Sequence, residues 1–171
     1  MKTLILLTHE NYSASKANRA LLESLPEGAP VVIRNLYEMY PDGRIDVAAE
    51  QSLAEQFDRI IFQYPMYWYD VPAFFKKWID EVLAFGWAFG TREALKGKSI
   101  GIVITAGCPR ETFTREEIGF TIEESALPVI ATIRYVKAEY AGLVTLCSAE
   151  NLDPAEVAES RAAYQRLVLG K

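Results

Sequence analysis

The sequence contains a single histidine, only two cysteines and no long apolar run. Cys108 and Cys147 form no CxxC pair, so neither a zinc site nor a disulfide framework is indicated. We therefore predict no metal and expect a reducing cytoplasm as the compartment. The longest apolar run near the N-terminus, Leu4 to Leu7, is too short to span a bilayer or to act as a signal peptide.

Basic residues are also scarce, since 18 Lys and Arg stand against 23 Asp and Glu and give a net charge of -5. Proteins that bind nucleic acid neutralise phosphates with clustered basic side chains, so we exclude nucleic acid as a partner. The patterns GxGxxG and GxxxxGKS are absent. Dinucleotide and triphosphate cradles of those two types are therefore unsupported.

Apolar strands alternate with helical patterns along the 171 residues, a length typical of one domain spanning residues 1–171. Strands are predicted at 2–8, 31–34, 59–64, 99–105 and within 138–146. Such alternation predicts an α/β fold whose parallel sheet is covered on both faces.

Helix starts are predicted from capping residues and prolines. Ser13 or Ser15 caps the first helix, Asp46 the second and Asp70 the third, while Pro128 starts a helix that ends near Tyr135. Asp153-Pro154 opens the last helix, 155–169. This helix is expected to turn a mixed edge inward, formed by Val157, Ala158, Arg161, Ala162, Gln165 and Leu169.

Ligands of parallel α/β sheets bind beyond the carboxyl ends of the strands, where strand order reverses. Three segments should meet there, at residues 9–18, 65–69 and 105–108. In the first, Ser15, Lys16, Ala17 and Asn18 form a helix start that suits a phosphate monoester or is ordinary capping. His9 is equally consistent with a phosphate or ring contact and with a solvated loop.

The second segment lies in an aromatic cluster, because 11 of the 20 aromatic residues fall between Phe62 and Phe89. The loop Pro65-Met66-Tyr67-Trp68-Tyr69 cannot turn every ring inward. A planar heterocycle can stack on Trp68 while the loop backbone binds its polar rim. Plain packing or a dimer interface explains the same composition.

The third segment is Thr105-Ala106-Gly107-Cys108, a hydroxyl and small residues that let a ligand approach the backbone closely. Cys108 has no recognisable base beside it, so nucleophilic catalysis is disfavoured. Asp70, Asp80 and Glu81 are better explained as a cap and a solvated helix face than as acid/base catalysts.

With these segments placed, the chain resembles the NAD(P)H quinone reductase group of flavodoxin-like proteins, which includes ancillary subunits of potassium efflux systems. The resemblance covers nearly the whole chain. Its strongest stretch is FQYPMYWYDVPAFFKKWIDEVLAFGWAFG, residues 62–90, and supporting matches are His9 with Ser15 to Asn18, Leu36-Tyr37, Tyr40-Pro41-Asp42, Glu50-Gln51, Leu95 to Lys98 and Leu127-Pro128.

The resemblance implies a flavodoxin-like three-layer sandwich with strand order 2-1-3-4-5 and bound FMN, with FAD as the alternative. It places the flavin phosphate at His9 and Ser15 to Asn18. The flavin ring would lie on Pro65 to Tyr69, with Thr105 to Cys108 at its other rim. Related proteins are homodimers whose Gly86 to Gly90 segment reaches the partner's flavin, which adds a substrate pocket of Trp87, Phe89 and Phe113.

The implied activity is ping-pong hydride transfer from NAD(P)H to FMN and then to a quinone or similar acceptor, so that no side chain is itself the catalyst. Two departures bear on it. Phe89 stands where relatives have a tyrosine, and no histidine follows the fourth strand. The alternative is therefore a regulatory subunit that binds a partner such as a potassium efflux antiporter, with incidental reductase activity.

Overall fold

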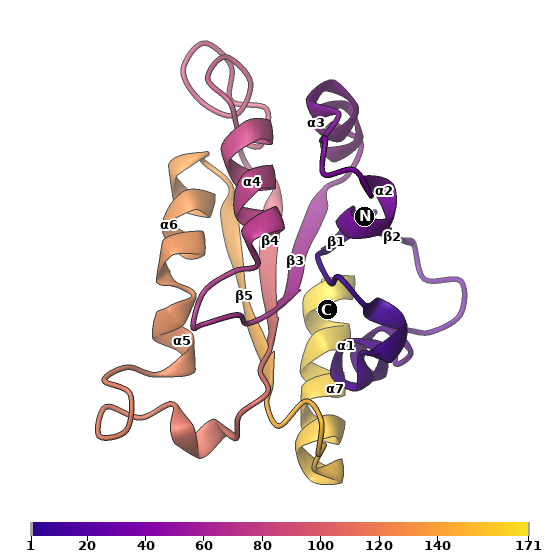
Figure 1. Ribbon diagram of the computed structural model, residues 1–171. Helices are drawn as coiled ribbons and strands as arrows, with labels where there is room; N and C mark the ends of the chain where they lie inside the picture. Colours follow the sequence, from indigo (N-terminus) through magenta and orange to yellow (C-terminus); the bar gives the residue numbers. More distant parts are fainter. Residues whose placement is uncertain (1, 171) are drawn as a thin grey trace.

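Five parallel strands form the centre of the computed structural model, which describes residues 2–170 (Figure 1). They are β1 (Thr3–Leu7), β2 (Val31–Asn35), β3 (Arg59–Pro65), β4 (Ser99–Thr105) and β5 (Glu139–Leu146). Their order is β2-β1-β3-β4-β5, so the predicted fold class and strand order are confirmed. Nearly every residue of β1, β3 and β4 is buried, as their unbroken apolar runs require.

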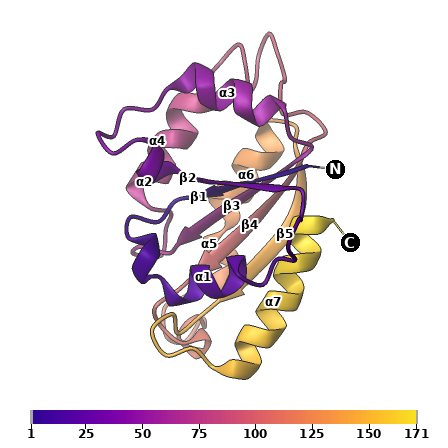
Figure 2. The ribbon, with the colours of Figure 1, turned by 90° about the vertical axis from the view of Figure 1, so that its right-hand side faces the viewer.

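Helices cover both faces of the sheet (Figure 2). The helices α1 (Lys16–Leu22) and α7 (Pro154–Leu169) lie on one face. The other face carries α3 (Val47–Glu55), α4 (Ala73–Val82) and α6 (Leu127–Tyr135). Four short elements complete the chain: η1 (Tyr12–Ala14), α2 (Leu36–Met39), η2 (Arg110–Thr112) and α5 (Ile122–Ser125).

Successive side chains of a strand point to opposite faces of the sheet, and this divides the core into two layers. On β3, Ile60, Phe62 and Tyr64 pack toward α4 and α6. Ile61, on the opposite face, joins the cluster beneath α1 and α7. In the part of the chain that is described, no helix is long and apolar enough to cross a membrane.

One helix prediction is wrong and another holds only in part. Asp70 does not cap α4, because Tyr67 and Asp70 exchange backbone hydrogen bonds of 3.0 and 3.1 Å that hold Asp70 in a turn. The helix instead begins at Ala73 after Pro72, without a side-chain cap. The inner edge of α7 was predicted only in part, since Val157 and Leu169 pack against the core but Ala158 and Ala162 are exposed. The buried residues of this helix are Ser160, Tyr164, Leu167 and Val168. The caps Ser15, Asp46 and Asp153 are confirmed.

A buried carboxylate anchors α3 to its neighbours. Glu50 is 1% exposed, and its oxygens accept hydrogen bonds from Arg34 Nε at 2.6 Å, from the Tyr40 hydroxyl at 2.7 Å and from Trp78 Nε1 at 2.9 Å. Arg34 lies on β2, Tyr40 follows α2, and Trp78 lies on α4. The Glu50 carboxylate therefore links α3 to all three of these parts of the chain.

We expect Glu50→Ala to lower the free energy of unfolding by about 3 kcal/mol, because one buried and two partly buried donors lose their acceptor at once. Urea denaturation measures this. Glu23→Ala is the matched control, since its exposed pair with Arg19 at 3.0 Å should contribute less than about 1 kcal/mol. Equal losses for both variants would contradict this role of Glu50.

Candidate flavin site

The three predicted segments meet at the carboxyl edge of the sheet. Backbone hydrogen bonds join them, from Thr8 N to Gln63 O at 2.9 Å and from Met66 N to Thr105 O at 2.8 Å. The crevice between them has two lobes that share Met66 and Gly107. One, of about 320 Å³, is lined by His9, Asn11, Ala14, Ser15, Lys16, Pro65, Met66, Tyr67, Thr105, Gly107, Ala149 and Glu150. The other, of about 200 Å³, is lined by Met66, Trp68, Tyr69, Ala106, Gly107 and Cys108.

The first lobe ends at the start of α1. Ser15 caps this helix by accepting a hydrogen bond from Asn18 N at 3.3 Å. Asn18 is fully buried and Ala17 packs in the core beneath α1, so neither side chain lines the lobe. Lys16 is exposed, and its Nζ donates to Glu150 O at 2.9 Å.

His9 carries a buried polar atom without a partner. Its Nδ1 makes no hydrogen bond to any residue in 2–170, and Thr8 Oγ1 beside it is likewise unpaired. Burial lowers the pKa of His9, against a smaller opposing effect of Glu10, so the imidazole is neutral near pH 7. Buried polar atoms are normally paired, so the unpaired Nδ1 of His9, which lines the first lobe, fits a site that receives a polar ligand.

The loop after β3 is a strained two-residue turn. Trp68 and Tyr69 have φ of 47° and 65°, values that side-chain-bearing residues rarely adopt. Trp68 is 93% exposed, so packing does not explain why a tryptophan stands there. Within the described chain no acceptor binds the N–H groups of Trp68 and Tyr69. An exposed ring on a strained turn, beside free backbone donors, suits a flat ligand with a polar rim.

The segment after β4 forms the opposite wall. Thr105 and Ala106 are 2% exposed, and a Cβ placed on Gly107 would meet nothing within 4 Å. Packing of the core therefore does not require glycine at position 107. Cys108 is half-buried in the second lobe. Cys147, nearby in the core, has its pKa raised to about 11 by burial, so it stays a thiol.

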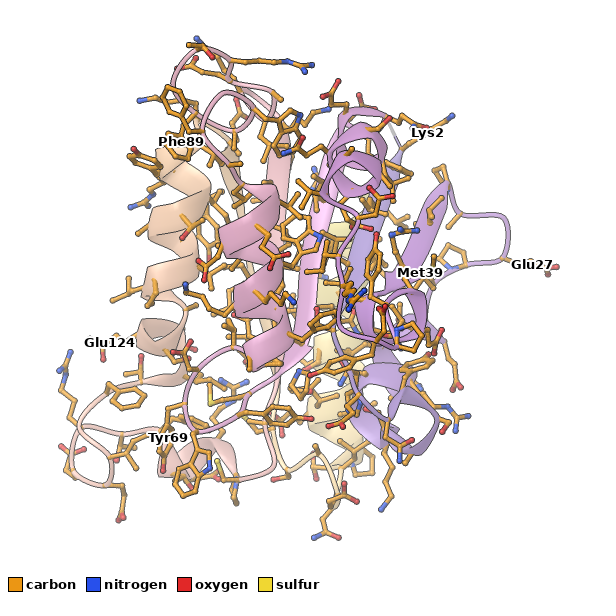
Figure 3. The ribbon with its side chains drawn as sticks, turned by 45° about the horizontal axis from the view of Figure 1, so that its top comes forward. Lys2, Glu27, Met39, Tyr69, Phe89 and Glu124 are labelled. Atoms are coloured by element: carbon orange, nitrogen blue, oxygen red, sulfur yellow. The ribbon has the colours of Figure 1, made fainter. Side chains whose placement is uncertain are left out.

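The three predicted substrate-pocket residues do not meet within one chain. Figure 3 shows Phe89 and Tyr69 at opposite ends of the molecule. Trp87 is 6% exposed, and its Nε1 donates to Glu55 at 2.7 Å. Phe113 is 5% exposed and packs with Ala106, Ile122 and Cys147 near the crevice. A pocket that combines Phe89 with Phe113 therefore requires a second copy.

Residues after β5 also contribute to the crevice and were missed from the sequence. Ala149 and Glu150 line the first lobe because Ala149 N donates to Ala106 O at 3.0 Å. Asn11 and Ala14 were missed as side chains although their segment was predicted. The available signal was that β5 pairs with β4, so the segments that follow these strands leave the sheet together.

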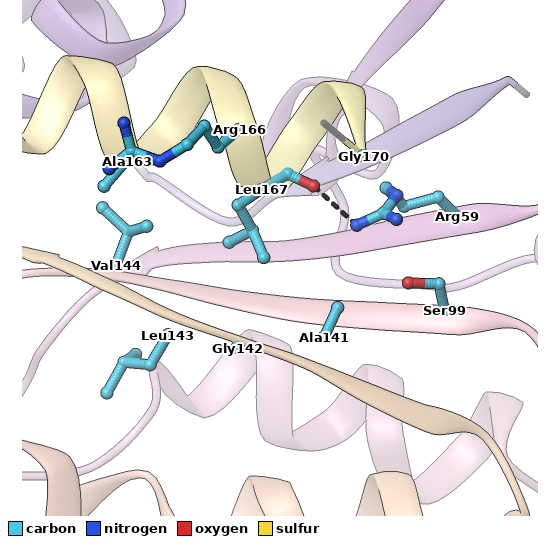
Figure 4. Close-up of a pocket in the computed structure, with 10 residues that line it drawn as sticks. All are labelled: Arg59, Ser99, Ala141, Gly142, Leu143, Val144, Ala163, Arg166, Leu167 and Gly170. Atoms are coloured by element: carbon cyan, nitrogen blue, oxygen red, sulfur yellow. Dashed lines mark hydrogen bonds between the residues drawn. The ribbon is translucent and has the colours of Figure 1, made fainter.

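A separate cavity of about 470 Å³ lies at the other end of the sheet (Figure 4). Arg59 and Ser99, the first residues of β3 and β4, line it, and Arg59 Nη1 donates to Leu167 O at 2.7 Å. Because it opens at the amino ends of these strands, this cavity takes no part in the crevice.

The family model described as flavodoxin-like fold matches residues 1–168, and the chain belongs to this family. It is 38% identical over 176 residues to the glutathione-regulated potassium-efflux system ancillary protein KefF of Klebsiella aerogenes, covering 96% of this chain and 94% of that one.

Two solved structures share the fold along the whole chain. One is general stress protein 14 of Treponema denticola in complex with FMN, with 33% identity, a TM-score of 0.84 and coverage of 98% of this chain and 95% of that one. The other is an NADPH-quinone reductase of P. pentosaceus, with 31% identity, a TM-score of 0.88 and coverage of 98% of both chains.

Since Trp68 is exposed and its backbone is strained, we expect Trp68→Gly to keep or raise the free energy of unfolding, by up to about 1 kcal/mol. Chemical denaturation followed by circular dichroism measures it. Trp78→Gly, at a position 1% exposed, should cost about 3 kcal/mol or more. A large loss at Trp68 would mean that its ring stabilises the fold.

Proposed function

We propose that this protein binds FMN in the crevice and is an NAD(P)H-dependent oxidoreductase. The observation that carries the proposal is the convergence of unpaired donors and an exposed aromatic ring on one crevice, in a family with an FMN-bound member. The NADPH-quinone reductase neighbour supports a nicotinamide nucleotide as the reductant. FAD is the alternative cofactor, and two free cysteines accord with a cytoplasmic protein.

The residues divide the crevice by chemistry. The hydroxyls of Ser15 and Thr105, His9, and the turn that begins at Lys16 would hold the phosphate and the sugar chain. Met66, Tyr67, Trp68 and Tyr69 would support one side of the flavin ring, with Ala106, Gly107 and Cys108 at its rim. Bound FMN supplies hydride chemistry, taking two electrons from NAD(P)H and giving them to an acceptor. The protein contributes position and hydrogen-bond donors rather than a nucleophile.

A quinone is the acceptor we propose, bound after NAD(P)H leaves the same ring face. A homodimer would complete this pocket, because the segment of Trp87 and Phe89 in one copy would face the crevice of the other. The surface around this segment is apolar, since Phe85 is 70% exposed and Tyr135 63% exposed. Phe89 packs between them, with ring centroids 5.8 and 5.3 Å away.

We expect the purified protein to be yellow or to become so with added FMN, and to bleach with NADPH. Trp68→Ala should weaken FMN binding about tenfold or more by removing the stacking ring. Fluorescence titration of the apo-protein measures this, with FAD as the comparison ligand.

Ile33→Ala is the matched control, because Ile33 is 49% exposed on the edge strand β2, away from the crevice and from the surface around Phe89, and should leave flavin binding unchanged. Size-exclusion chromatography with light scattering follows the dimer. A wild-type protein that binds neither FMN nor FAD, with Trp68→Ala converting a dimer to a folded monomer, would show that the aromatic loop is an interface instead.

The second candidate function is an ancillary subunit of a potassium efflux antiporter. The KefF relative and the phenylalanine at 89, which lacks a phenolic hydroxyl, favour it. We expect steady-state NADPH oxidation to rise at least tenfold with added quinone if the first function holds. Flavin reduction without quinone-stimulated turnover would support the ancillary role and contradict the quinone acceptor.

A further inference from the structure

A chain of buried side chains crosses the core from α7 to the crevice. The Tyr164 hydroxyl donates to Gln63 Oε1 at 2.8 Å, and Gln63 Nε2 donates to Asn18 Oδ1 at 3.0 Å. Asn18 Nδ2 then donates to Thr105 Oγ1 at 2.9 Å and to Ser15 Oγ at 3.1 Å. Tyr164, Gln63 and Asn18 are each 0% exposed, so the chain of bonds is shielded from bulk water.

Tyr164 sets the donor-to-acceptor direction of this chain of hydrogen bonds. Its ring lies in the apolar cluster beneath α1 and α7, and Gln63 is the partner its hydroxyl has among residues 2–170. Burial raises the pKa of Tyr164, so the phenol keeps its proton. A buried hydroxyl proton requires an acceptor, which turns the Gln63 oxygen toward Tyr164 and the Gln63 nitrogen toward Asn18.

At the crevice, the chain of hydrogen bonds ends at the hydroxyl groups of Ser15 and Thr105. Both N–H bonds of the Asn18 amide are used, one toward Thr105 and one toward Ser15. Ser15 Oγ also accepts from the Asn18 backbone N–H, so both of its lone pairs are occupied. Each hydroxyl is thus an acceptor toward the core, and no residue in the described chain accepts its own proton. Both residues line the first lobe.

We propose that Tyr164 and Gln63 are positioning residues, which turn the hydroxyl protons of Ser15 and Thr105 into the crevice as donors for the phosphate monoester of FMN. The inference rests on the proposed function. It explains how a site whose one lysine is paired with Glu150 favours a dianion, since neutral donors of fixed direction replace a cation.

Reversal of the two amides is the state that Tyr164 prevents. In the reversed state Asn18 Oδ1 faces Ser15 and Thr105 and accepts their protons, so neither hydroxyl is a donor to the ligand. Tyr164→Phe removes the hydroxyl that selects one direction while it keeps the buried ring. Phosphate binding must then restore the donor orientation at a cost in affinity.

The test compares FMN with riboflavin, which lacks the phosphate, on the apo-protein by flavin fluorescence quenching. We expect the Kd of riboflavin divided by the Kd of FMN to fall about tenfold in Tyr164→Phe, because FMN binding weakens and riboflavin binding does not. Tyr64→Phe is the matched control. Tyr64 neighbours Gln63 on β3, is 2% exposed on the other face, and makes no hydroxyl hydrogen bond within residues 2–170.

A double-mutant cycle adds a second measurement. In a Ser15→Ala, Thr105→Val background, Tyr164→Phe should no longer change the ratio, because the groups it acts through are gone. If wild-type protein prefers FMN but Tyr164→Phe leaves the ratio unchanged, or weakens both ligands equally, the positioning role is overturned and the proposed function stands. If wild-type protein binds neither flavin, the proposed function itself fails.

Discussion

The parallel direction of the strands is the constraint on which the rest of this structure depends. Every strand delivers its carboxyl end to one edge of the sheet, and the order β2-β1-β3-β4-β5 reverses beside β1. The segments that follow β1, β3 and β4 therefore meet although they are far apart in the chain. Backbone hydrogen bonds across these strand ends, such as Met66 N to Thr105 O, hold the walls of the crevice together.

Polar anchors cross the apolar layers on both sides of the sheet. Glu50 gathers donors from β2 and α4 on one face, and the Tyr164 to Asn18 chain of bonds links α7 to the crevice on the other. Glu50, Gln63 and Asn18 are themselves buried, so their hydrogen bonds act in a low dielectric and specify one arrangement of the core. Only the Tyr164 to Asn18 chain of bonds reaches the crevice. The packing of α7 is therefore connected to the direction in which the crevice hydroxyls donate.

Local pattern predicted the strands and most helix ends, because burial on both faces of a parallel sheet requires unbroken apolar runs. It failed where tertiary contacts decide. The inner face of α7 includes Ser160 and Tyr164, which look polar or ambiguous in a periodic pattern but find partners in the core, as Ser160 Oγ does with Thr145 O at 3.0 Å. Asp70 resembles a helix cap, yet the turn from Tyr67 to Asp70 holds it outside α4.

The sequence by itself determined the fold class, the three segments at the strand ends and the aromatic loop, since these follow from residue type and order along the chain. Tertiary structure decided what the side chains there can do. It buried Asn18 and joined it to Gln63, it left Trp68 exposed on a turn with positive φ, and it placed Phe89 away from the crevice of its own chain. Hydrogen-bond direction, burial and distance between remote residues exist only once the chain has packed.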